Sequence, residues 1–186
     1  MKAYLHKAMA LVKSLGGAVV VFGSGKCRKC PEHLSFGEGY RKLVEVYRVT
    51  GEVAKEYGIK VVIEPLSRNE TNMICTMAEG AILEADVAHP NVGLLSDYFH
   101  VMANHDSIQD MEIIRNFGHI HIASGNGRRY PLPEAVEGEE YEAFFKALKT
   151  IGYDERISIE GKTENMECDG AAALKFLKEL EGKACE

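Results

Sequence analysis

Short apolar runs rich in β-branched residues alternate along the chain with longer segments in which apolar positions recur with a helical period. The short runs predict strands, and the longer segments predict amphipathic helices. The predicted strands cover residues 18–22, 59–64, 92–97, 118–123 and 156–160, and the predicted helices cover residues 2–15, 38–57, 71–85, 107–115, 139–152 and 170–182. Because strands alternate with helices, we expect βα units around a parallel sheet.

Four of the five predicted strands end in a residue type that commonly binds metal ions. Side chains alternate between the two faces of a strand, so these polar residues point to one face while the neighbouring apolar residues point to helices on the other. The carboxyl ends of parallel strands meet at one edge of a sheet, where active sites form in α/β proteins. We therefore expect one shared site, made of Glu64, Asp97, His121 and Glu160.

Three converging carboxylates repel one another and raise one another's pKa values unless a cation lies between them. A divalent ion resolves this repulsion, and three oxygen ligands with one imidazole suit Mn²⁺, Co²⁺, Mg²⁺ or Zn²⁺. Separate structural roles are the alternative, because a carboxylate at the end of a strand often caps the following helix.

Four motifs carry a resemblance to a known family: IEPLSRNETN at 63–72, SDYFH at 96–100, HIHIASGNGRR at 119–129 and SIEGK at 158–162. In their order and spacing, they resemble the xylose isomerase-like TIM barrels, a group of sugar phosphate isomerases and epimerases that includes ketose 3-epimerases and hydroxypyruvate isomerases. The chain aligns with the C-terminal five βα units of that barrel. The resemblance implies an α/β fold, an incomplete (β/α)8 barrel with about five parallel strands, in which residues 1–186 form a single partial domain.

The resemblance also implies roles for individual residues. Glu64, Asp97, His121 and Glu160 would bind one divalent metal ion, and Glu64 and Glu160 would exchange protons with a sugar or sugar phosphate through an enediolate intermediate. Substrate contacts are implied for Glu70, His100 and an arginine soon after the metal-binding histidine. Arg128 is the nearest match, and Arg129 is the alternative.

Composition and charge limit the possible partners. The chain has 22 Lys and Arg against 28 Asp and Glu, for a net charge of −6, so no nucleic-acid partner is expected. No apolar run approaches the ~20 residues that span a membrane, and the N-terminal segment does not read as a secretory signal, so the cytoplasm is expected. Five scattered cysteines, including the pair Cys27 and Cys30, are expected to be reduced thiols.

The length of 186 residues is short for a complete barrel, which typically takes about 250 residues. A full member of the family would begin with three further βα units. An open sheet exposes two strand edges and inner apolar surface, so we expect a homo-oligomer that covers the open side. Two alternatives to the isomerase or epimerase are a non-catalytic barrel that retains the metal site and a nuclease related to endonuclease IV, although the latter chemistry needs a multi-zinc cluster with more histidines.

Overall fold

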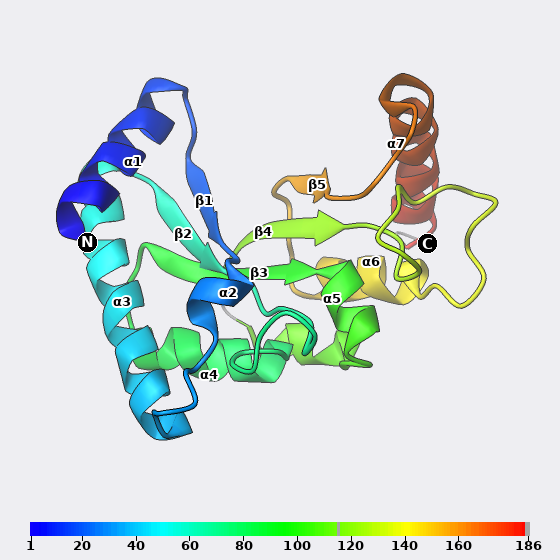
Figure 1. The fold of residues 1–186 in the computed structure, drawn as a ribbon. Coiled ribbons are helices and arrows are strands. Elements are labelled where there is room, and N and C mark those ends of the chain that lie inside the picture. The colour runs from blue at the N-terminus through cyan, green and yellow to red at the C-terminus, as the bar shows by residue number, and fades with distance from the viewer. Residues whose placement is uncertain (115, 185–186) are drawn as a thin grey trace.

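The computed structural model describes residues 1–114 and 116–184. Five strands form one parallel sheet in the order β1-β2-β3-β4-β5, so that strands adjacent in the sequence are also adjacent in space (Figure 1). The strands are β1 (Val19–Phe22), β2 (Lys60–Ile63), β3 (Val92–Asp97), β4 (Phe117–Ile122) and β5 (Ile157–Ile159). All five predicted strands are confirmed, with small differences at their ends.

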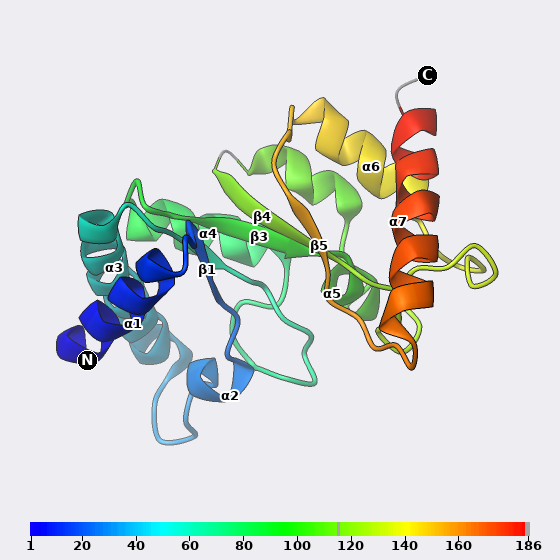
Figure 2. The same ribbon diagram turned by 90° about the horizontal axis from the view of Figure 1, so that it is seen from above.

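Helices cover the outer face of this curved sheet, as the view from above shows (Figure 2). Along this layer α1 packs against α3, α3 against α4, and α6 against both η1 and α7. The helices are α1 (Lys2–Ser14), α2 (Gly25–Arg28), α3 (Phe36–Tyr57), α4 (Met77–Val87), α5 (Tyr98–Ala103), the 3-10 helix η1 (Ile108–Ile113), α6 (Tyr141–Thr150) and α7 (Met166–Lys183).

The prediction of a helix over 71–85 was wrong at its start. Helix α4 begins at Met77, after a capping box in which the side chains of Thr76 and Glu79 each accept a hydrogen bond from the other's backbone N–H. The segment before it is irregular, and Ile74 has a φ of 59°. The sequence pattern also missed the short helices α2 and α5, and the segment expected to be helical over 107–115 forms the 3-10 helix η1.

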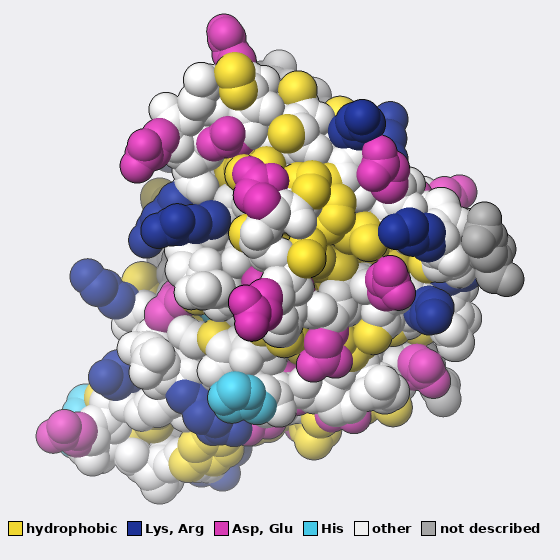
Figure 3. All heavy atoms as spheres, turned by 90° about the vertical axis from the view of Figure 1, so that its right-hand side faces the viewer, with side chains coloured by type: hydrophobic (Ala, Val, Ile, Leu, Met, Phe, Trp, Pro, Cys, Tyr) yellow, Lys and Arg dark blue, Asp and Glu magenta, His cyan; other side chains and the backbone are white. Residues whose placement is uncertain are grey.

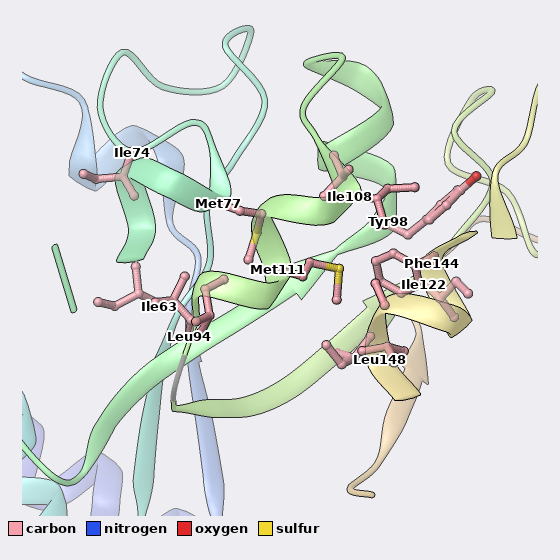
Figure 4. Packing of buried hydrophobic residues seen from close by; sticks show 14 of the residues in the cluster. Ile63, Ile74, Met77, Leu94, Tyr98, Ile108, Met111, Ile122, Phe144 and Leu148 are labelled. Carbon is pink, nitrogen blue, oxygen red and sulfur yellow. The ribbon is translucent and has the colours of Figure 1, made fainter. Parts of the chain in front are cut away.

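The main hydrophobic core lies between the outer face of the sheet and the helices (Figure 4). Ile63, Leu94 and Ile120, which lie on the strand face opposite to the polar residues, are fully buried there. Tyr98 and Phe144 meet edge to face in the same core, with ring centroids 5.2 Å apart. This packing fixes the outward face of each strand, so the alternate residues must point to the inner face.

The sheet does not close on itself. Within the described residues, β1 pairs only with β2 and β5 only with β4. Val19 and Val21, on the inner face of β1, each remain 37% exposed, while Phe22 on the other face packs against the core. The predicted incomplete barrel of five parallel strands is therefore confirmed.

Two further expectations concern single features of the chain. None of the helices in the described residues is both long enough and apolar enough to cross a membrane. Cys27, Cys30, Cys75 and Cys168 are free thiols, as expected, and Cys185 lies outside the described residues.

Candidate active site

Four strands deliver one polar side chain each to the carboxyl edge of the sheet. Asp97 is the last residue of β3 and pairs in register with His121 of β4, while Glu64 and Glu160 directly follow β2 and β5. One potential ligand atom from each residue lies within 4.8 Å of all the others. The structure thus brings together the four residues that the sequence predicted to share a site.

His121 is the centre of this cluster. Its Nδ1 atom lies 2.6 Å from Oε2 of Glu160 and 3.1 Å from Oε1 of Glu64. Burial alone would lower the pKa of His121, but the hydrogen bonds to the two carboxylates outweigh burial and raise that pKa to about 9. The same hydrogen bond from His121, together with the charge of Arg128, lowers the pKa of Glu160 to about 2.

Arg128 lies across the cluster and contacts two of the carboxylates. Its Nη2 atom lies 2.8 Å from Oδ2 of Asp97 and 2.8 Å from Oε2 of Glu160, and its Nε atom donates to the backbone carbonyl of Glu160. The Asp97 side chain is fully buried, and burial raises its pKa to about 7 in spite of the arginine. Of the two arginines left open by the sequence, Arg128 makes these contacts, whereas Arg129 forms a strand-like bridge with Lys162.

His100 and Glu70 lie beside this arginine. Nδ1 of His100 accepts a hydrogen bond from the backbone N–H of Ser67 at 3.0 Å, and Nε2 lies 3.2 Å from Nη1 of Arg128. Burial and the arginine charge lower the pKa of His100 to about 3, so its ring is neutral. Oε1 of Glu70 lies 3.8 Å from Nδ1 of His100 and accepts from the Ser67 hydroxyl at 3.1 Å.

Sequence reasoning missed three residues that shape this site. Gly23, directly after β1, leaves room for the Glu64 carboxylate, because a Cβ atom there would lie 1.7 Å from Oε2 of Glu64. Ser67 bonds to both Glu70 and His100, and Phe99 lies below Arg128. Ser67 and Phe99 lie within the motifs at 63–72 and 96–100, whereas Gly23 lies in none of the four motifs. The contacts between Gly23 and Glu64, Ser67 and His100, and Phe99 and Arg128 join segments far apart in the sequence, so no local pattern reveals them.

The donor set fits a divalent metal ion. Ligand atoms about 2.0–2.2 Å from a shared ion lie no more than about 4.4 Å apart, so a cluster within 4.8 Å needs only small adjustments. Oxygen and imidazole ligands suit several divalent ions, and no single one is selected by them.

Comparison with known proteins places the chain in a family. The family described as xylose isomerase-like TIM barrel matches residues 2–180 of the chain. The chain belongs to this family.

The relatives described here are identical to the chain at about a third or fewer of the aligned residues. The 3-dehydro-D-guloside 4-epimerase of Escherichia coli (strain K12) is 32% identical over 130 residues, which cover 67% of this chain and 47% of that protein. The L-ribulose 3-epimerase of Mesorhizobium japonicum is 27% identical over 167 residues, covering 84% of this chain and 52% of the relative. The chain thus spans about half the length of these relatives.

Solved structures show the same fold. A structure of L-ribulose 3-epimerase matches 98% of this chain and 67% of its own chain with a TM-score of 0.80 and 21% identity. The structure of the IolI protein with a zinc atom bound matches with a TM-score of 0.71 and 21% identity, covering 98% of this chain and 66% of its own. At these identities the likeness establishes the barrel fold of the chain.

Proposed function

We propose that this chain carries the active site of a divalent-metal-dependent isomerase or epimerase that acts on a sugar or sugar phosphate. The observation that supports this most directly is the convergence of Glu64, Asp97, His121 and Glu160 within 4.8 Å at the carboxyl edge of the sheet. Relatives add support, since they include the L-ribulose 3-epimerase already described and a D-psicose 3-epimerase of Agrobacterium fabrum that is 31% identical over 159 residues, 74% of this chain and 54% of that protein.

The four converging residues would hold one divalent ion, which when bound supplies a Lewis acid that makes a proton beside a carbonyl group easier to remove. Glu64 and Glu160 are the proposed acid and base. One carboxylate removes the proton from the carbon next to the carbonyl, which leaves an enediolate. The other carboxylate returns a proton to the opposite face of the same carbon, which gives an epimer, or to the neighbouring carbon, which gives an isomer.

Arg128, His100 and Glu70 are the proposed substrate-binding residues. The guanidinium of Arg128 lies 2.8 Å from Glu160, so it can hold a substrate oxygen next to the proposed base. His100 is neutral and its Nε2 atom lies beside Arg128, where the ring can contact a substrate hydroxyl, while Glu70, whose side chain is 44% exposed, can accept from a hydroxyl.

Turnover of ketoses tests this proposal. The purified chain, loaded with Mn²⁺ or Co²⁺, is incubated with L-ribulose, D-psicose, D-fructose, D-tagatose and phosphorylated ketoses in D₂O, and products are followed by NMR. We expect an epimer or isomer with deuterium at the reacting carbon. Glu160→Gln is expected to abolish turnover, whereas Glu164→Gln, a change at an exposed carboxylate in the following loop, should leave it unchanged.

Metal or sugar binding without turnover is the second candidate function. The observation that favours it is the 50% exposure of the Glu160 side chain on the open side of the barrel, where water can reach the proposed base. Tight Mn²⁺ binding by the wild-type chain, with no turnover on the whole ketose panel, would support this alternative and contradict the enzyme proposal.

We also propose that the chain associates with a second copy of itself on the open side of the sheet. The exposed inner residues Val19 and Val21 and the unpaired edge of β1 support this, since such edges favour association. A second copy there would also shield Glu160 from water.

A further inference from the structure

Phe99 touches three of the residues that make up the candidate site. Its backbone N–H donates to Oδ1 of Asp97 at 3.0 Å, and its ring meets the His100 ring edge to face with centroids 5.2 Å apart. Its ring also lies under the guanidinium of Arg128, with Cζ 4.9 Å from the ring centroid. Phe99 is half-buried at the start of α5, directly after the strand that supplies Asp97.

The hydrogen-bond partners of Arg128 lie along the edge of its guanidinium group. The Nη2 atom faces Asp97 and Glu160, and Nε donates to the Glu160 carbonyl. These contacts do not use the two faces of the guanidinium, because N–H groups donate along the plane. The Cζ atom of Arg128 lies over the ring of Phe99, and the attraction between a cation and an aromatic ring is strongest where water is excluded.

The backbone gives Arg128 little help. Its φ of 53° lies in the left-handed region, which residues other than glycine seldom adopt, so this turn is held by its surroundings. The Arg128 side chain is only 20% exposed and must be oriented by the groups around it. Phe99 is also tied to Asp97, the partner of Arg128, because its backbone N–H donates to the Asp97 carboxylate.

We infer that Phe99 is a positioning residue, whose aromatic ring holds the Arg128 guanidinium in the orientation that meets Asp97, Glu160 and the substrate. The catalytic consequence rests on the proposed function, whereas the placement of Arg128 does not. An aliphatic side chain of similar size would fill the space but would not attract the cation. Replacing Phe99 with leucine therefore distinguishes the need for an aromatic ring from the need to fill space.

The catalytic test compares Phe99→Leu and Phe99→Tyr under the conditions in which the wild-type chain turns over a ketose. We expect kcat/KM to fall about tenfold in Phe99→Leu, and Phe99→Tyr to keep most of it, because tyrosine retains the ring face. In an Arg128→Met background the Phe99→Leu change should have little further effect, because the two residues act as a unit. Phe36→Leu, at an exposed phenylalanine of α3, is the matched control.

A second measurement decides the inference whether or not the chain is an epimerase. The Nε–H resonance of Arg128, assigned by its loss in Arg128→Lys, should be shifted upfield by the ring current of Phe99 in the wild-type chain and in Phe99→Tyr. In Phe99→Leu it should move downfield. An unchanged resonance in Phe99→Leu would overturn the inference, as would a loss of kcat/KM on changing Phe99 to leucine that is equal in the wild-type chain and in Arg128→Met. Absent turnover together with the expected NMR shifts would count only against the proposed function.

Discussion

The Glu64 carboxylate occupies the space that a side chain at Gly23 would fill at the carboxyl edge of the sheet. A Cβ atom on residue 23 would lie 1.7 Å from Oε2 of Glu64 and 2.9 Å from its Cδ. The two residues follow neighbouring strands, in which Phe22 pairs with Ile63. Because Gly23 has no side chain, the Glu64 carboxylate can lie within 3.1 Å of His121.

Gly23→Ala should therefore weaken metal binding while leaving the fold intact. The added methyl group displaces the Glu64 carboxylate, and a displaced ligand is expected to lower the affinity for Mn²⁺ about 10- to 100-fold. Calorimetric titration with Mn²⁺ measures this, and circular dichroism checks the fold. Gly182→Ala is the control, because a Cβ atom at this position of α7 meets nothing within 4 Å. Unchanged affinity in Gly23→Ala would contradict the role given to this glycine.

The ion pair between His121 and Glu160 predicts how stability depends on pH after metal is removed with EDTA. The pKa of His121 is raised to about 9 from about 6.5 in the unfolded chain, so its contribution is complete below pH 6.5 and is lost as the pH rises through 9. The pKa of Glu160 is lowered to about 2 from about 4.3, so its contribution is complete above pH 4.3 and is lost as the pH falls toward 2. The pair therefore stabilises most between these two limits.

Urea unfolding of the wild-type chain and of His121→Gln at pH 6 and pH 9 checks the alkaline side. We expect the difference in free energy of unfolding between the two proteins to shrink by on the order of 1–2 kcal/mol from pH 6 to pH 9, since the half-exposed Glu160 is partly screened by water. His33→Gln, at an exposed histidine, should show no such change. A difference that is the same at both pH values would argue against the ion pair.

The sequence was sufficient to predict that four strand ends would supply one site. Parallel strands end at the same edge, so Glu64, Asp97 and His121 had to converge once the strands were recognised. The close approach of Gly23 to the Glu64 carboxylate could not be predicted in this way, because the contact joins positions 41 residues apart and depends on how the loop after β1 turns.

The start of α4 was predicted wrongly for a different reason, because the sequence carries a local signal for the true start of the helix. The helical period over 71–85 includes residues that the structure places in a loop. Tertiary contacts hold this loop, since the Asn104 side chain donates to the carbonyls of Leu66 at 3.2 Å and Cys75 at 2.7 Å. The capping box of Thr76 and Glu79 marks the true boundary, and it is readable in the sequence.

That capping box predicts the effect of Thr76→Ala. The Thr76 hydroxyl accepts from the backbone N–H of Glu79 at 3.1 Å, and its loss should lower the free energy of unfolding by about 1 kcal/mol. Thr76→Ser keeps the hydroxyl and should lose much less. Urea unfolding measures both, and Mn²⁺ affinity should be unchanged in either variant, because Thr76 touches none of the candidate ligands. Equal stability of the alanine and serine variants would contradict the capping role.

The open side of the barrel combines exposed apolar residues with unpaired strand edges. On one side, Val19 and Val21 lie on the inner face of β1. On the other, the face that carries α7 gathers hydrophobic side chains among charged ones (Figure 3), and Met166 and Leu174 of this helix are 73% and 53% exposed. Apolar surface of this kind favours association, because covering it removes it from water.

Light scattering after size-exclusion chromatography should therefore give a mass above the 20.6 kDa of one chain. Val21→Lys should shift the protein toward the monomer, since association would bury an unpaired charge on the inner face of β1. Ile82→Lys changes a residue of α4 that is 60% exposed and lies on the outer layer, so it should leave the mass unchanged. A wild-type chain that is a stable, monodisperse monomer would refute self-association, and equal effects of the two lysines would show that association does not use the open side.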